Sequence, residues 1–170
     1  MNIRILIVCM IVLGGLFAGA QAKILQAPKP AVNKVVSTGT NTGLNTAEQE
    51  LLTAIAQYRK QKGKKILQHH VGVASVARSY AQYLVDNKRF SHDDKQGKDT
   101  GYRLTKAGFP SSFWGEVIAN AKTAKQALET FKKSTAHNDI LLSNTYNMIG
   151  VGAIGDKRVV ILYYQKPLKK

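Results

Sequence analysis

The segment Val159–Tyr164 is apolar at every position, and this constrains the fold more than any other feature of the chain. Successive side chains of a strand point to opposite faces of a sheet, so a strand of this kind needs cover on both faces. It is the second arm of a predicted hairpin, in which Met148–Ile154 and Val159–Gln165 flank a turn at Gly155–Arg158. We therefore predict a central strand in a sheet that is covered on both sides.

Helical patterns elsewhere in the chain can supply that cover. The segment Thr46–Gln49 predicts a capping-box start for a helix that ends at Gly63, and a second apolar stripe ends near Lys88. Tyr102–Ala107 predicts a short helix, and Phe113–Ala119 a strand. The predicted fold class is α+β, a three-layer α-β-α sandwich with a small, mainly antiparallel sheet.

The stretch between Thr123 and Gly152 places polar side chains beside this core. Thr123 can cap a helix whose apolar residues recur at helical spacing, and Ser134 and His137 continue that spacing to the predicted helix end. A short apolar turn is expected at 140–142, before the strand. The residues expected to be buried are Tyr80, Leu128, Phe131 and Leu162. A serine and a histidine that end a core-facing helix predict one side of a cleft.

Two further residues are candidates for that cleft. His92 follows a predicted helix and precedes two acids, and Glu116 lies in a strand between Trp114 and Val117. A carboxylate in such an apolar setting needs a partner or a raised pKa. From composition alone, two other interpretations stay open: a structural role for His92, and an exposed edge-strand position for Glu116.

Several short motifs, in order, resemble the bacterial, cysteine-poor branch of the CAP superfamily, the sperm-coating-protein-like and pathogenesis-related-1-like group. They are Phe131-x-x-Ser134-x-x-His137, Leu141-Leu142, Tyr146, Ile149–Gly152, Phe90-Ser91-His92 and Gly115–Ala119, and the match covers about residues 47–166. The resemblance implies an α-β-α fold and a cleft tetrad of two histidines and two acids.

Carried over by position, the resemblance assigns three of these four residues: His92, Glu116 and His137. Ser134 stands where the family has its second glutamate, and Val117 stands where it has an asparagine. Two imidazoles and a carboxylate could bind Zn²⁺ with an open fourth position, act as a proton relay, or hydrogen-bond one another structurally. Ser134 is the only hydroxyl near the set, and no strand-turn-helix elbow surrounds it.

These alternatives lead to competing functions. We expect an exported binding module rather than an enzyme, with a lipid, a glycan or an anionic surface as its ligand. The second function is a metal-dependent extracellular hydrolase that uses His92, Glu116 and His137. The third is a polyanion-coating protein in which the cleft has no role.

The N-terminal segment predicts export. Arg4 precedes the uncharged run Ile5–Ala20, and Ala20-Gln21-Ala22 is a small-x-small cleavage signal. A retained membrane anchor is the alternative, but the run is shorter than the roughly 20 residues that a bilayer span needs. We expect a signal peptide at 1–22, a flexible linker at 23–45, the CAP-like domain at 46–167 and a basic tail at 168–170. The expected localisation is secreted or periplasmic.

The net charge and the cysteine content limit the possible binding partners and the possible sources of stability. Cleavage removes Arg4 and no acid, so the formal charge falls only from +15 to +14. A basic exterior favours anionic lipid, lipopolysaccharide or polysaccharide, and either a solvated surface or a dedicated polyanion site explains it. No motif for specific nucleic-acid binding is present in the sequence. Cys9 lies in the leader, so the expected mature chain, a monomer, has no cysteine and depends on its core for stability.

Overall fold

The computed structural model of the protein describes residues 43–110 and 113–166. Helices and strands follow one another in the order α1 (Thr46–Gln61), β1 (Gln68–His69), α2 (Val71–Asp86), α3 (Thr100–Lys106), β2 (Trp114–Asn120), α4 (Ala124–Lys133), α5 (Thr135–Leu142), β3 (Met148–Ile154) and β4 (Lys157–Tyr163). The predicted leader 1–22, most of the linker 23–45 and the tail 168–170 lie outside the described residues. In the described residues, no helix has the length and apolar content to cross a bilayer.

The sheet has the strand order β1-β3-β4-β2. β4 pairs antiparallel with β3 and with β2, and the short β1 adds a parallel pairing to β3. The predicted hairpin and the mainly antiparallel sheet are confirmed. The turn is shorter than predicted, because Lys157 and Arg158 already belong to β4. Gly155 in the turn has φ 53°, a left-handed conformation that glycine adopts without steric cost.

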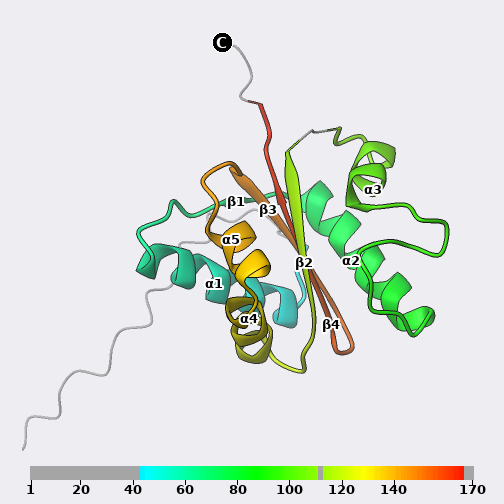
Figure 1. The fold of residues 1–170 in the computed structure, drawn as a ribbon, viewed down its shortest axis with the longest axis horizontal. Coiled ribbons are helices and arrows are strands. Elements are labelled where there is room, and N and C mark those ends of the chain that lie inside the picture. Colours follow the sequence, from blue (N-terminus) through cyan, green and yellow to red (C-terminus); the bar gives the residue numbers. More distant parts are fainter. Residues whose placement is uncertain (1–42, 111–112, 167–170) are drawn as a thin grey trace, which may run out of the picture. The chain divides into compact units, whose positions relative to one another are not determined.

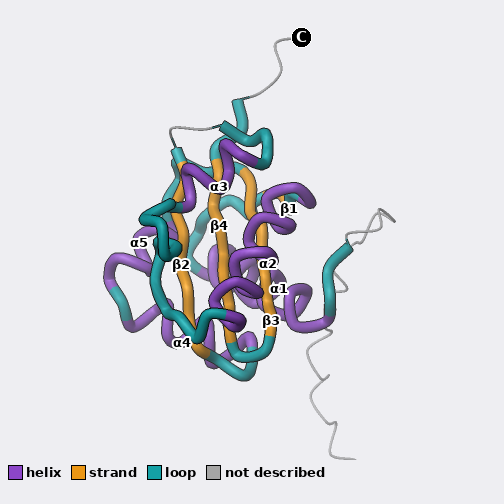
Figure 2. Tube along the Cα trace, turned by 90° about the vertical axis from the view of Figure 1, so that its right-hand side faces the viewer, coloured by secondary structure: helices purple, strands orange, loops and turns teal. Residues whose placement is uncertain are grey.

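The central position of β4 explains its unbroken apolar sequence. Val160 and Leu162 lie in a core cluster with residues of α1, α4 and α5, whereas Val159 and Ile161 lie in a second cluster with residues of α2 and α3. Figure 1 shows the two helical layers on either side of the sheet, and Figure 2 shows β2, β4 and β3 side by side in that order. The predicted three-layer α-β-α arrangement is therefore confirmed.

Two glycines of β3 bring α2 directly onto the sheet. A Cβ atom at Gly150 would lie 2.4 Å from the backbone nitrogen of Ala74, and one at Gly152 would lie 2.4 Å from the carbonyl carbon of Ala77. Helix backbone and strand backbone are thus in contact, which a larger residue would prevent. This packing fixes α2 and the chain that follows it relative to the sheet.

The start of α1 differs from the prediction. The N-cap is Asn45 rather than Thr46, since its side chain accepts a hydrogen bond from the Glu48 backbone N–H at 2.9 Å and the Glu48 carboxylate accepts one from the Asn45 N–H at 3.0 Å. The capping box therefore lies one residue earlier than predicted. Glu48 is fully buried and also accepts two hydrogen bonds from Arg78, which tie α1 to α2.

The predicted single helix ending at His137 is wrong, because the chain breaks at Ser134 into α4 and α5. Ser134 has an extended conformation (φ −95°, ψ 116°), and its hydroxyl accepts a hydrogen bond from the His137 N–H at 3.4 Å, so it caps the next helix. The predicted apolar turn at 140–142 is the end of α5. Phe131, Leu162 and Tyr80 are buried as predicted, and Leu128 packs half-buried against the same core.

Candidate functional site

Glu116 is the centre of the candidate site. It lies on β2 opposite Ile161 of β4, and only 4% of its surface is exposed. β2 is an edge strand, as the alternative interpretation expected, but the side chain is not exposed as that interpretation required. Because neighbouring strand residues face opposite sides, Val117 points into the core with α1 and α4. The residue that replaces the family's asparagine therefore lies on the other face of the sheet from Glu116.

Both oxygens of the Glu116 carboxylate are engaged. Arg103 of α3 donates from Nη2 to Oε2 at 2.8 Å, and His92 donates from Nδ1 to Oε1 at 2.9 Å. A carboxylate accepts hydrogen bonds, so the imidazole is the donor in this contact. The buried acid thus has the partners that an apolar setting requires, one of them a cation that is itself 13% exposed.

Arg103 was missed by the sequence analysis. Its guanidinium lies 3.4 Å from the ring centroid of Tyr80, and it also donates to the Thr100 hydroxyl at 2.6 Å and to the His92 carbonyl at 3.0 Å. The sequence pointed to Arg103 only indirectly. A buried acid requires a partner, and Arg103 is a cation on the short helix before the strand that carries Glu116. The sequence did not show which cation would reach Glu116, because the contact depends on how α3 packs on β2.

His92 lies in the loop after α2, with about half of its side chain exposed. The hydrogen bond to Glu116 raises the pKa of His92 above its ordinary value, although burial acts in the opposite direction. His92 is therefore held in place by the acid on one side while its ring remains accessible from solvent.

His137 reaches the same place from the opposite layer. It lies in the first turn of α5, and its ring centroid is 6.1 Å from that of His92 and 5.9 Å from that of Phe131. Burial lowers the pKa of His137, and the neighbouring His92 lowers it further. Its Nδ1 atom is buried and has no hydrogen-bond partner among the described residues.

The structure thus brings His92, Glu116 and His137 together at the free edge of β2. The Ser134 hydroxyl caps α5, and a reactive role for it stays a prediction. A hollow of about 310 Å³ opens beside Glu116, with Trp114 and Tyr146 as aromatic walls and Asp93 and Asp99 as further acids. The Tyr146 hydroxyl donates to the Trp114 carbonyl at 3.3 Å, which joins the two walls. We call this hollow the edge cleft.

The candidate zinc ligands do not form a metal site as their side chains lie. Within 43–110 and 113–166, no group of three or more His, Cys, Asp and Glu is arranged to hold a metal ion. Arg103 and His92 each hydrogen-bond to one oxygen of Glu116, so a metal at this carboxylate would have to share an oxygen with one of these donors or displace it. Zinc binding by His92, Glu116 and His137 stays a prediction.

Comparison with known proteins identifies the family. The profile of the CAP, or cysteine-rich secretory protein, family matches residues 52–164, and the chain belongs to this family. The resemblance in the sequence motifs is thereby confirmed. No match was found among curated proteins.

Solved structures share the fold at low sequence identity. An extracellular protein with an SCP domain from Bacillus anthracis is 23% identical, with a TM-score of 0.67 over 70% of this chain and 40% of that one. An outer surface protein from Borrelia burgdorferi is 22% identical, with a TM-score of 0.67 over 72% of this chain and 97% of that one. A cysteine-rich secretory protein from Staphylococcus aureus is 19% identical, with a TM-score of 0.60 over 70% of this chain and 38% of that one. This chain spans about 40% of the first and third proteins.

Proposed function

We propose that this protein is an exported, non-enzymatic CAP-domain binding module whose edge cleft holds part of a glycan. The observation that carries the proposal is the lining of the cleft, in which Trp114 and Tyr146 provide apolar walls and the Asp93 and Asp99 carboxylates provide acceptors beside them. Sugars present apolar ring faces and outward hydroxyl donors, which fit aromatic walls and carboxylates respectively.

The state of the buried acid argues against catalysis. A general acid or base must reach the proton that it transfers, whereas both Glu116 oxygens are already bound by Arg103 and His92. Ser134, the only hydroxyl considered as a nucleophile, has its oxygen directed at a backbone N–H of α5. In this arrangement the ionic network serves to hold α3, the His92 loop and β2 together around the cleft.

Export is supported by the pattern of residues 1–22 and by the description of two similar structures as extracellular or outer surface proteins. We propose secretion or periplasmic release with a mature start at Lys23. N-terminal sequencing of protein recovered outside the cytoplasm should begin at Lys23. Recovery of a chain that still begins at Met1 would contradict cleavage and favour the anchor.

The basic exterior supports a second, less specific contact with anionic lipid, lipopolysaccharide or polysaccharide. Lys62 and Lys132 flank the Tyr58 ring, with Nζ at 5.9 Å and 5.4 Å from its centroid, where α1 packs on α4. Attraction of this kind is long-range and decreases with salt. We expect it to bring the monomeric protein to an anionic surface, and we expect no sequence-specific binding to nucleic acid.

The glycan proposal is tested by titrating the protein with a panel of neutral and anionic oligosaccharides while following Trp114 fluorescence. Trp114 is the only tryptophan in the chain, so the signal reports on the cleft itself. We expect saturable binding that Trp114→Ala abolishes in calorimetry and that Phe90→Ala, a change of an exposed ring outside the cleft, leaves unchanged. Binding that both variants retain would place the glycan elsewhere.

One observation favours the alternative, a metal-dependent hydrolase: the His92 and His137 rings lie close together, and His137 Nδ1 has no partner among the described residues. Because Ser134 replaces the second acid, we expect zinc binding that is micromolar or weaker and that is lost below about pH 6 as the imidazoles protonate. Calorimetry should show no zinc uptake by the His92→Ala/His137→Ala double variant. Equal uptake would place the metal at another site.

A further inference from the structure

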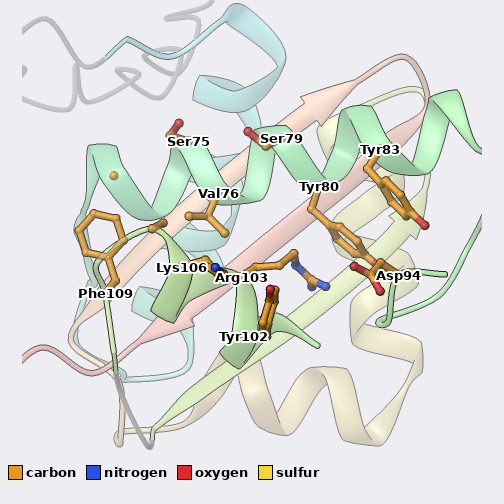
Figure 3. A pocket seen from close by; sticks show the side chains of 12 residues that line it. Ser75, Val76, Ser79, Tyr80, Tyr83, Asp94, Tyr102, Arg103, Lys106 and Phe109 are labelled. Carbon is orange, nitrogen blue, oxygen red and sulfur yellow. The ribbon is translucent and has the colours of Figure 1, made fainter. Parts of the chain in front are cut away.

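A larger hollow lies between α2 and α3, away from the edge cleft. Its volume is about 550 Å³, and Figure 3 shows it extending from Phe109 at one end to Tyr83 and Asp94 at the other. This volume is within the range of about 300–1,000 Å³ that is typical of small-molecule sites. We propose that this groove, the α2–α3 groove, binds a small anion with a flat ring body, at a site distinct from the cleft.

Aromatic rings make up the walls of the groove and favour a flat ligand. The Tyr80 and Tyr83 rings on α2 are stacked, with centroids 5.6 Å apart and planes inclined by 9°. Tyr102 stands across from them on α3 and is 42% exposed. Tyr80 itself is buried against Tyr83 and the Arg103 guanidinium. A ring that enters between the two helices can therefore stack on Tyr102 or pack against Tyr83, an arrangement that gains free energy beyond simple burial.

Phe109 closes one end of the groove. Its ring packs so tightly on Gly72 of α2 that a Cβ atom there would lie 2.1 Å from the Phe109 ring. His70, the N-cap of α2, contacts the same ring edge-on, with centroids 5.1 Å apart. The end wall is thus held from two sides, so a long ligand chain cannot extend past Phe109 at this end of the groove.

Positive charge in the groove comes from α3. Arg103 and Lys106 both line it, whereas Asp94 is its only acid within the described residues. The Asp94 carboxylate already accepts hydrogen bonds from the backbone N–H groups of Gln96 and Lys98, each at 2.8 Å. The charge of Arg103 is already paired with Glu116, so Lys106 is the cation that favours an anionic ligand in this groove.

Arg103 and Lys106 have different roles in the groove. Arg103 is fixed by Glu116 and by its contact with the Tyr80 ring, so it supplies a positive charge at a constant position. Lys106 is exposed, makes no ion pair within the part of the chain that the structure describes, and has its Nζ 5.9 Å from the Tyr102 ring centroid. Its ammonium is therefore free to bind a sulfonate, carboxylate or phosphate group of a ligand that is stacked on Tyr102.

The probe is 1-anilinonaphthalene-8-sulfonate, a flat ring system with one anionic group. We expect saturable binding with a Kd on the order of 10 µM and amide shifts in NMR spectra that centre on α2 and α3. Lys106→Gln should weaken binding about threefold and Tyr102→Ala about fivefold. The matched controls are Lys133→Gln on the opposite helical layer and Phe90→Ala, and both should leave the Kd unchanged. All of the substituted side chains are exposed, so the variants should fold.

Two competitors separate the parts of the proposal. The neutral dye N-phenyl-1-naphthylamine should bind more weakly than the sulfonate, and decyl sulfate, an anion with a flexible chain, should displace it poorly. Equal binding of the neutral dye would overturn the assignment of an anion, and efficient displacement by decyl sulfate would overturn the assignment of a ring. Amide shifts centred on Trp114 and Tyr146, or equal losses in the control variants, would overturn the site itself.

Discussion

Replacing Glu116 by glutamine tests whether the buried ionic network holds the edge cleft together. The substitution keeps the shape of the side chain but removes the charge that Arg103 and His92 share. Its amide can accept a hydrogen bond from only one of these donors, and its NH₂ group then faces the other. The network should therefore lose one of its two hydrogen bonds to this side chain, and the other should lose the carboxylate charge, without a change in packing volume.

The expected loss of stability depends on the contacts that Arg103 retains in the variant. Breaking a buried ion pair by removing one partner costs about 3–5 kcal/mol when the remaining charge is left unpaired. Arg103 still donates to the carbonyl oxygens of His92 and Lys98 and to the Thr100 hydroxyl, and it remains stacked on Tyr80. We therefore expect the free energy of unfolding to fall by about 2–3 kcal/mol.

The loss should also depend on pH. The hydrogen bond to Glu116 raises the pKa of His92, so His92 contributes stability that is present in full below its unfolded pKa and is lost as pH rises through its folded pKa. The Glu116→Gln variant lacks this contribution. Its deficit should therefore be larger at about pH 5.5 than at about pH 8.5.

Urea unfolding followed by Trp114 fluorescence measures both effects. The matched control is Glu129→Gln, which removes an ion pair with Lys132 of 2.7 Å whose two side chains are largely exposed. Exposed ion pairs contribute little to stability because solvent screens them, so this control should change the free energy of unfolding little. If Glu116→Gln costs no more than Glu129→Gln, the network does not stabilise the fold and the structural role assigned to it is wrong.

Three further predictions use the same unfolding assay or NMR. Phe131→Ala, at a fully buried site, should cost about 3–5 kcal/mol, and a loss below about 1 kcal/mol would show that this helix face is not core. Ser134→Ala should cost about 1 kcal/mol through the lost α5 cap, whereas its exposed neighbour Thr135→Ala should cost less. Burial lowers the pKa of His137, so NMR titration should place it below that of His92. Its contribution to stability should be present above about pH 6.5 and be lost as pH falls.

The sequence predicts the fold well wherever one residue pattern has one structural solution. A strand that is apolar on both faces, such as 159–164, must be central, and its alternating contacts with both helical layers follow directly. The break at Ser134 was not predicted, because Ser134 and His137 follow Phe131 at intervals of three residues whether the chain forms one helix or two. Only the serine's ability to cap the following turn distinguishes two helices from one, and that depends on its backbone angles.

The sequence predicted which residues come together at the site but not the contacts that they make. His92, Glu116 and His137 were identified from their surroundings and from the family motifs, and the structure brings them to one edge. Arg103 was not identified, since nothing local to α3 shows that it will face β2. The capping role of Ser134 was not identified either, because its partner is the backbone of the next helix rather than another side chain.

The position of β4 has a consequence for the order in which the sheet forms. β2 and β3 both pair with β4, which comes after them in the described chain order, so neither has its main partner until β4 has been added. Pairing between segments distant in sequence is slow, and unpaired strand edges are open to association with other chains. If export proceeds as proposed above, a chain that emerges N-terminus first would therefore cross the membrane without a finished sheet. Its edge cleft would form only after translocation has delivered β4.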